Sequence, residues 1–236
     1  MVVNRIENRT KEYLDGEYHI QNSTSLPNKH NVYSGKKAYK TKICAFSIDL
    51  RNSTKLLMED GRAVSGKVHK AFLNVVTEVI NYFNGDIRDF QGDSVLAYWK
   101  SDKDEINKAV RAGLTINWFL KVKLEDYFKP YGGVDFGIGI DFGNIHVLKV
   151  GITTSERNND LVYIGKCVNF AVGIANQLKK PRSLGISEAV YSNIDEGIIY
   201  STKDNQRVNI WEKYKFKWKD DDVEILRTSY HCEISE

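Results

Sequence analysis

The chain has 236 residues, 42% hydrophobic and 28% charged, which is the balance of an ordinary soluble globular protein. Its 34 basic and 31 acidic residues leave a net charge of +3, too small to indicate a nucleic-acid partner. No stretch approaches the roughly 20 apolar residues of a membrane helix, and the start lacks the apolar core of a secretion signal. Three widely spaced cysteines favour neither disulfides nor zinc, which is typical of the reducing cytoplasm. Together with the lack of a long apolar stretch, this predicts a cytoplasmic protein without a membrane partner.

The first 38 residues are polar and show no sustained periodicity. We therefore expect an N-terminal extension over residues 1–38 and one main domain over residues 39–236. The lysines between positions 36 and 42 are expected to form a solvated linker, with phosphate contact as the less favoured alternative.

The first elements of the main domain alternate between strands and helices. Residues 42–50 are apolar on both faces, which predicts a buried central strand. The polar run 51–54 suits a helix start capped by Asn52 or Ser53. A stripe of apolar residues predicts a longer helix over 65–83.

A hairpin over 87–99, turning at 91–93, follows that helix. Asp102 and Glu105 form a capping box for another helix. A strand over 134–141, a tight turn at 142–144 and a strand over 145–150 come next.

The remaining pattern predicts a strand at 161–164, a helix over 168–178, and short strands near 184–187 and 223–230. Aromatic and basic residues alternate over 211–219, which favours an amphipathic strand over one that presents a lysine to phosphates. Hairpins that alternate with long helices predict an α+β fold, with one mixed or antiparallel sheet covered by helices.

Two aspartates stand at strand ends, Asp49 after the buried strand and Asp93 after Gly92 in the hairpin. Burying an unpaired carboxylate costs several kcal/mol or more, so such groups usually have partners. A carboxylate pair at neighbouring strand ends can hold two divalent cations about 4 Å apart, as in-line displacement at phosphorus requires. The alternative is that Asp49 caps a helix and Asp93 makes a turn.

Five segments resemble, in order and spacing, the motifs of class III nucleotide cyclases, the superfamily of adenylate and guanylate cyclases. They are 46–56 (FSIDLRNSTKL), 90–97 (FQGDSVLA), 137–143 (GIGIDFG), 164–171 (IGKCVNFA) and 184–191 (LGISEAVY). The resemblance runs from about residue 42 to residue 194. It implies a ferredoxin-like palm whose central, mostly antiparallel sheet is covered by helices.

The resemblance also implies site residues. Asp49, Asp93 and the carbonyl of Leu50 would bind two Mn²⁺ or Mg²⁺ ions, and Asn169 would complete the catalytic set. The active site would lie between two catalytic domains, so Asn169 would act from the opposite protomer of a head-to-tail homodimer. Without this motif, Asn169 would be read as a helix cap.

The start of the first helix is the expected triphosphate site. The residues are Arg51, Asn52, Ser53 and Thr54, whose amides and hydroxyls suit phosphate oxygens at a helix N-terminus.

One departure concerns the transition state, because the family places an arginine four residues after the asparagine and this chain has Gly173 there. Arg51, Arg88 or Arg182 would have to substitute, at a loss of about 2–4 kcal/mol if none does. The alternative is a catalytically degenerate domain that binds nucleotide without turnover.

A second departure concerns the base, because the adenine-selecting positions hold Asp89 and Val162. An ionised carboxylate only accepts hydrogen bonds, so Asp89 disfavours ATP and leaves guanine, cytosine and uracil open. The alternative is that Asp89 simply pairs with Arg88, Arg51 or Lys166.

The motifs 49–53 (DLRNS) and 90–93 (FQGD), together with the absence of adenine-reading residues, resemble those of the pyrimidine cyclases of Pycsar anti-phage defence. That resemblance implies conversion of UTP, the commoner substrate among these cyclases, or of CTP, into cyclic UMP or cyclic CMP, and favours a uridylate cyclase. The product would act on a separate effector protein that does not contact the cyclase. A guanylate or adenylate cyclase remains the alternative.

Overall fold

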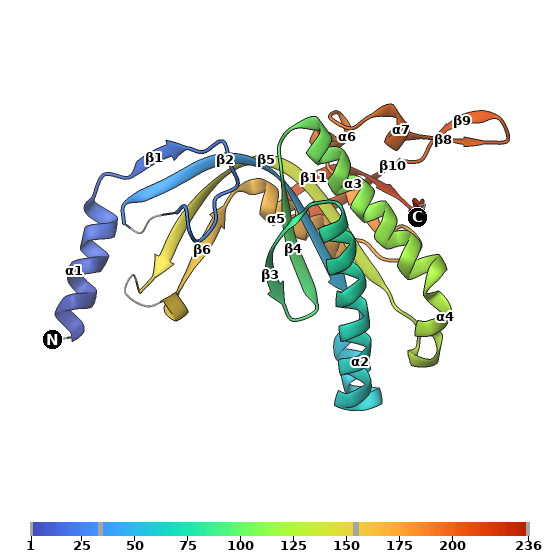
Figure 1. Ribbon diagram of the computed structural model, residues 1–236, viewed down its shortest axis with the longest axis horizontal. Coiled ribbons are helices and arrows are strands. Elements are labelled where there is room, and N and C mark those ends of the chain that lie inside the picture. Colours follow the sequence, from blue (N-terminus) through green and yellow to red (C-terminus); the bar gives the residue numbers. More distant parts are fainter. Residues whose placement is uncertain (1, 33–34, 153–155, 235–236) are drawn as a thin grey trace. The chain divides into compact units, whose positions relative to one another are not determined.

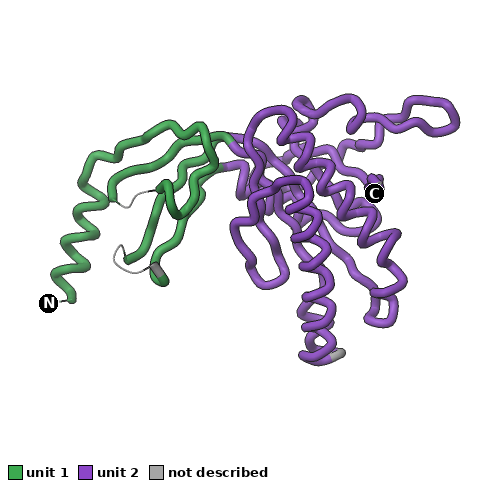
Figure 2. The backbone as a smooth tube through the Cα atoms, in the orientation of Figure 1, with its two compact units in different colours: residues 1–42, 144–165 green, residues 43–143, 166–236 purple. Residues whose placement is uncertain are grey.

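The computed structural model describes residues 2–32, 35–152 and 156–234. The backbone forms two compact units, unit 1 with residues 1–42 and 144–165 and unit 2 with residues 43–143 and 166–236 (Figure 2). The sequence boundary near residue 38 stays a prediction, and 144–165 group with the N-terminal residues rather than with unit 2.

Unit 1 is built around the ends of two long strands, β2 (Lys37–Leu50) and β5 (Phe136–Gly151), which both continue into unit 2. β1 (His19–Asn22) pairs with β2 in parallel, and β6 (Asn159–Ile164) pairs with β5 in antiparallel. Helix α1 (Val2–Asp15) has no buried residue. It forms within the extension where the sequence shows no sustained period, and the short 3-10 helix η3 (Glu156–Asn158) completes the unit.

Unit 2 holds most of the sheet, in the strand order β10-β11-β7-β5-β2-β4-β3 (Figure 1). Its strands beyond β2 and β5 are β3 (Asp86–Gln91), β4 (Ser94–Lys100), β7 (Leu184–Ile186), β8 (Tyr200–Lys203), β9 (Gln206–Asn209), β10 (Glu212–Trp218) and β11 (Asp221–Thr228). Its helices are α2 (Ser53–Tyr82), α3 (Lys103–Trp118), η1 (Phe119–Lys123), α4 (Glu125–Phe128), η2 (Lys129–Tyr131), α5 (Lys166–Gln177), α6 (Glu188–Tyr191) and α7 (Glu196–Ile199).

Side-chain alternation on β5 separates the two faces of this sheet. Phe136, Ile138 and Ile140 enter the core that α2 and α3 cover. Gly137 and Gly139 lie on the other face, where a Cβ would meet the backbone of α5. A Cβ on Gly139 would collide with the carbonyl oxygen of Ala171 and reach 2.5 Å from the nitrogen of Ala175. The glycines of this strand therefore let α5 rest directly on the backbone of the sheet.

Several predicted elements are confirmed. The buried central strand is β2, the hairpin is β3–β4 with Gly92 at φ 66°, and Asp102 accepts a hydrogen bond from the Glu105 amide at 3.1 Å. The two helical segments predicted after β2 form one element, α2, which is kinked at Gly61 (φ 80°).

The tight turn predicted at residues 142–144 is wrong. β5 is one extended strand of 16 residues through this segment. It is held by parallel pairing with β7 on one side of the segment and by antiparallel pairing with β6 on the other. Pairing partners remote in the sequence thus override the local turn signal of Gly143 and Asn144.

Candidate active site

The strand register places the two predicted metal aspartates beside each other. Asp49 near the end of β2 lies opposite Ser94, and Ser94 directly follows Asp93. Residues opposite each other in antiparallel strands have Cα atoms about 4.5–5.5 Å apart. The Ser94 hydroxyl donates to Asp49 Oδ1, so the hairpin that carries Asp93 also orients Asp49.

Asp93 carries an unsatisfied carboxylate oxygen. Its Oδ2 is buried, and no described residue forms a hydrogen bond with it. The nearest ring nitrogen is Nε2 of His69, at 4.0 Å, and the other nitrogen of that ring contacts the Ser65 carbonyl oxygen at 2.7 Å. Leaving a buried acceptor unpaired costs about 1–3 kcal/mol or more, so this position suits a bound cation.

The donor set fits a magnesium- or manganese-type ion. Among the described residues, no three side chains of His, Cys, Asp or Glu form a group that would hold a metal by itself. Such ions commonly take one or two carboxylates and complete their shell with water and substrate phosphates. Asp49, Asp93 and the backbone carbonyl of Leu50 are therefore the candidate protein ligands.

Arg51 ties Asp49 to α5. Its Nη1 donates to Asp49 Oδ2 at 2.6 Å, its Nε donates to the Leu178 carbonyl at 3.1 Å, and its Nη2 donates to the Ala175 carbonyl. The amide of Arg51 is also used, since it donates to the Asp135 carbonyl at 2.8 Å. A triphosphate at Arg51 would compete with these bonds, which makes Asn52, Ser53 and Thr54 the freer part of the predicted phosphate site.

The start of α2 opens onto a cavity of about 500 Å³. Asn52 occupies the cap position with φ 60°, and its side chain makes no capping hydrogen bond, unlike the expected cap. Lys55 of the first turn and Lys180 also line the cavity. Glu59, Glu125 and Asp135 line it as well, so the feature that favours an anion here is the helix N-terminus.

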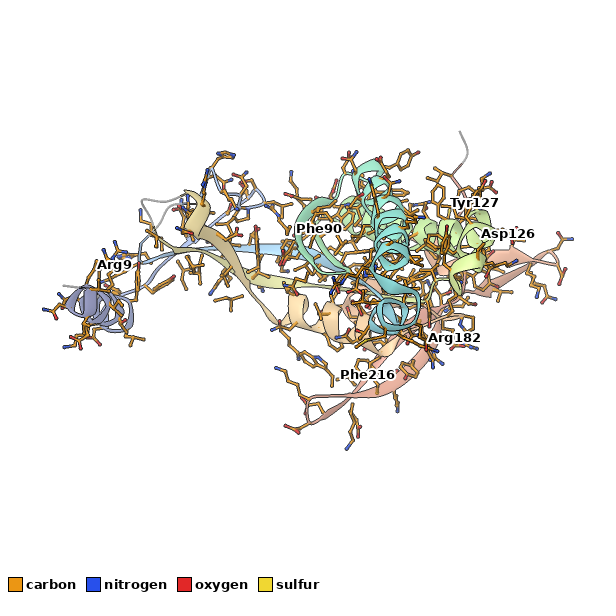
Figure 3. All side chains as sticks on the ribbon, turned by 90° about the horizontal axis from the view of Figure 1, so that it is seen from below. Arg9, Phe90, Asp126, Tyr127, Arg182 and Phe216 are labelled. Carbon is orange, nitrogen blue, oxygen red and sulfur yellow. The ribbon has the colours of Figure 1, made fainter. Side chains whose placement is uncertain are left out.

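Asn169 lies inside α5, one turn from its start, so the alternative reading as a helix cap is excluded. Its side chain is exposed. At the next turn a Cβ on Gly173 would collide with the indole of Trp218, 2.6 Å from its Cδ1. Trp218 belongs to β10, whose aromatic face packs on α5 as the amphipathic pattern predicts, and Phe216 (Figure 3) joins the same cluster.

Two groups near the start of α5 have shifted pKa values. Burial raises the pKa of Asp141, against the opposing effect of a hydrogen bond from Ser187. Burial also raises the pKa of Cys167 to about 12, with a further contribution from the charge of Asp141. Cys167 is therefore a neutral packing residue and no candidate nucleophile.

Comparison with curated proteins finds relatives over most of the chain, although no family model matches it. A uridylate cyclase of Rhodovulum sp. (strain MB263) is 24% identical over 92% of this chain and 91% of that protein. A uridylate cyclase of Burkholderia cepacia is 26% identical over 80% and 83%. A cytidylate cyclase of Staphylococcus aureus is 26% identical over 73% of this chain but only 47% of its own length.

Solved structures agree with these relatives. The adenylyl cyclase CyaB from P. aeruginosa matches with a TM-score of 0.66 and 20% identity, covering 81% of this chain and 95% of that one. The guanylyl cyclase Cya2 matches with a TM-score of 0.66 and 22% identity, covering 82% and 94%. The chain has the class III nucleotide cyclase fold. The fold class and the resemblance predicted from the five motifs are thereby confirmed, and the relatives support a nucleotide cyclase.

Within the class III cyclase fold, the three candidate substitutes for the missing arginine all have carboxylate partners. Arg51 pairs with Asp49, Arg88 with Asp86, and Arg182 (Figure 3) with Glu212. Arg88 also sits where the pairing of β3 with β4 shifts register.

The base-selecting positions lie on two different strands. Asp89 on β3 is exposed, and its Oδ2 accepts a hydrogen bond from Gln91 at 2.9 Å. Of the arginines proposed as alternative partners of Asp89, Arg51 pairs with Asp49 and Arg88 with Asp86. Val162 is an exposed residue of β6 in unit 1.

Sequence reasoning missed His69, because no second ligand stands at metal spacing near it in the chain. Only the packing of α2 against the β3–β4 hairpin brings it to Asp93. None of the described helices combines the length and apolar character needed to span a bilayer.

Proposed function

We propose that the protein is a metal-dependent pyrimidine nucleotide cyclase, which converts UTP, or CTP, into the 3′,5′-cyclic nucleotide and pyrophosphate. The observation that carries the proposal is the buried, unpartnered Oδ2 of Asp93 beside the strand position opposite Asp49. The similarity to uridylate and cytidylate cyclases supports the substrate class.

The reaction closes a ring on one nucleotide. The ribose 3′-oxygen loses its proton to solvent and bonds to the α-phosphorus, while the bond from that phosphorus to the bridging oxygen breaks and pyrophosphate leaves. Mn²⁺ or Mg²⁺ held by Asp49, Asp93 and the Leu50 carbonyl would lower the pKa of the 3′-hydroxyl and neutralise phosphate charge. The chain itself orients Asp49 through Ser94 and Arg51.

The remaining roles fall to helix ends and to a second protomer. The N-terminus of α2 at Asn52, Ser53 and Thr54 would hold the β- and γ-phosphates. Asn169 would orient the ribose or α-phosphate from the opposite subunit of a head-to-tail homodimer. Its exposed position on α5, outside the protomer's own core, supports this assignment.

Asp89 would select the base by accepting a hydrogen bond from uracil N3–H or from the cytosine amino group. The cyclic nucleotide would be a second messenger in Pycsar anti-phage defence, acting on a separate effector. A guanylate or adenylate cyclase is the alternative, and the indole that fills the space beside Gly173 favours a degenerate nucleotide-binding domain as the second candidate.

The test incubates purified protein separately with the four ribonucleoside triphosphates and Mn²⁺, with products identified by mass spectrometry. We expect cyclic UMP or cyclic CMP from the wild type, and a loss of at least about 100-fold in Asp49→Ala and in Asp93→Ala. Cyclic AMP alone would refute the base assignment. Undiminished cyclisation in both variants would refute the metal site.

A further inference from the structure

We propose that Lys166 supplies the positive charge that stabilises the α-phosphate in the transition state, in place of the arginine that this chain lacks at position 173. This inference rests on the proposed cyclase function and adds a catalytic residue to it. The observation behind it is the arrangement of α5, Trp218 and the lysines around that ring.

The first step is helix geometry. Lys166 and Gly173 are seven residues apart on α5, which is two turns to within about 20° of rotation. Asn169 lies three residues after Lys166 and four before Gly173, so all three share one side of the helix. On this stripe of Lys166, Asn169 and Gly173, a cation at position 166 lies on the N-terminal side of Asn169. A cation at position 173 would lie on its C-terminal side.

The second step is the path of the side chain. Lys166 Nζ lies 5.8 Å from the ring centroid of Trp218, the same ring that fills the space beside Gly173. The lysine thus ends near the ring that lies against position 173. Phe170 packs against the same indole, with ring centroids 4.8 Å apart, so the ring is held in place.

The third step is charge. Lys166 is exposed, and no described carboxylate forms an ion pair with it, whereas the three arginines considered as substitutes each have one. The nearby acid Asp141 is buried and hydrogen-bonded to Ser187. An exposed cation beside Asn169 is free to meet a phosphate brought by a second protomer, and a charge-assisted contact of this kind strengthens as charge develops.

Lys219 provides a matched control. Its Nζ lies 5.0 Å from the same Trp218 ring, and it is exposed like Lys166. It belongs to the turn between β10 and β11 rather than to the Asn169 stripe. A general effect of positive charge near Trp218 would act through both lysines, but a specific contact would act through Lys166 alone.

The experiment measures kcat and KM for UTP and CTP in wild type, Lys166→Met, Lys166→Arg and Lys219→Met, with thermal unfolding of each. We expect Lys166→Met to lower kcat about 100- to 1000-fold, with KM changed less than about threefold and unfolding unchanged. Lys166→Arg should keep more than about a tenth of the wild-type kcat, because it keeps the charge. Lys219→Met should lower kcat less than about tenfold.

A rescue sharpens the test. Adding Gly173→Arg and Trp218→Ala to Lys166→Met clears the indole and restores a cation at the other end of the stripe, and should raise kcat at least about tenfold. The inference is overturned if Lys166→Met keeps wild-type kcat, if Lys219→Met loses as much, or if neither Lys166→Arg nor the rescue restores turnover. A wild type that makes no cyclic nucleotide from any triphosphate would instead overturn the proposed function and this inference together.

Discussion

Asp49 and Asp93 differ in how the folded chain satisfies their carboxylates. Asp49 accepts hydrogen bonds at both oxygens, from Ser94 and Arg51. Asp93 keeps one buried oxygen without a partner among the described residues. Asp49 is therefore fixed in orientation before any ligand binds. The unpaired oxygen of Asp93 is the group that favours binding of a cation.

A half-buried lysine gives the clearest pH prediction. Burial lowers the pKa of Lys121 from 10.5 to about 8, and the charge of Lys180 adds to the shift. Its Nζ donates to the carbonyls of Pro181 at 3.0 Å and Ser229 at 2.8 Å. Between pH 8 and 10.5 the unfolded chain binds more protons at this site than the folded chain. The contribution of Lys121 to the free energy of unfolding therefore rises with pH in this window.

Urea unfolding of Lys121→Met and wild type at pH 7 and pH 10 measures this contribution. The stability of the variant relative to wild type should be lower at pH 10 than at pH 7, because only the wild type gains when this half-buried amine loses its proton. Lys123→Met, at an exposed site on the same element, should show no such pH-dependent difference. A constant difference for Lys121→Met across the range would contradict the assignment.

Single residues differed in how far their positions and contacts could be predicted from the sequence. Asp49, Asp93 and Asn169 stand in motifs whose spacing is local, so their strand and helix positions were predictable. The contacts of Arg51 with Ala175 and Leu178 span more than 120 positions in the chain, as the hydrogen bonds record. No local pattern predicts such contacts, and the same is true of Trp218 against Gly173.

At the scale of elements, the close approach of α5 to β5 is what puts Asn169 in place. Gly139→Ala would push a methyl group into the Ala171 carbonyl, and backbone cannot yield as a flexible side chain does. We expect a loss of about 1–3 kcal/mol in the free energy of unfolding, as overpacking typically costs. Chemical denaturation measures it.

Gly66→Ala is the matched control for this substitution. Nothing lies within 4 Å of a Cβ at Gly66, which is an exposed position of α2. This variant should gain about 0.5–1 kcal/mol, because alanine favours a helix interior over glycine. Equal effects at both glycines would mean that α5 does not rest on β5 as described.

Elements were predictable where their pattern is determined by burial. β2, the β3–β4 hairpin and α3 all present apolar faces to one core, and each appears close to its expected place. The helix α1 buries nothing, so no apolar period marks it. The false turn in β5 arose because Gly143 and Asn144 suit a turn locally, whereas strand pairing keeps them extended.

At the scale of the whole molecule, the proposed head-to-tail dimer predicts complementation. Asp49→Ala and Asn169→Ala each remove one half of every site in a homodimer. Mixing the two proteins with subunit exchange should form heterodimers with one intact site, giving up to about a quarter of wild-type activity from random pairing. Product formation by the mixture, compared with each variant alone at the same total concentration, measures this. A mixture no more active than its parts would refute shared sites.

The hydrogen bonds of the Arg51 guanidinium have a further consequence for such a dimer. One guanidinium binds Asp49 and also the C-terminal carbonyls of the helix that carries Asn169. In a head-to-tail pair those two residues serve different substrates. Binding of substrate at one site would thus shift a helix that serves the other site. At saturating manganese, a plot of rate against nucleotide concentration should therefore depart from a simple hyperbola.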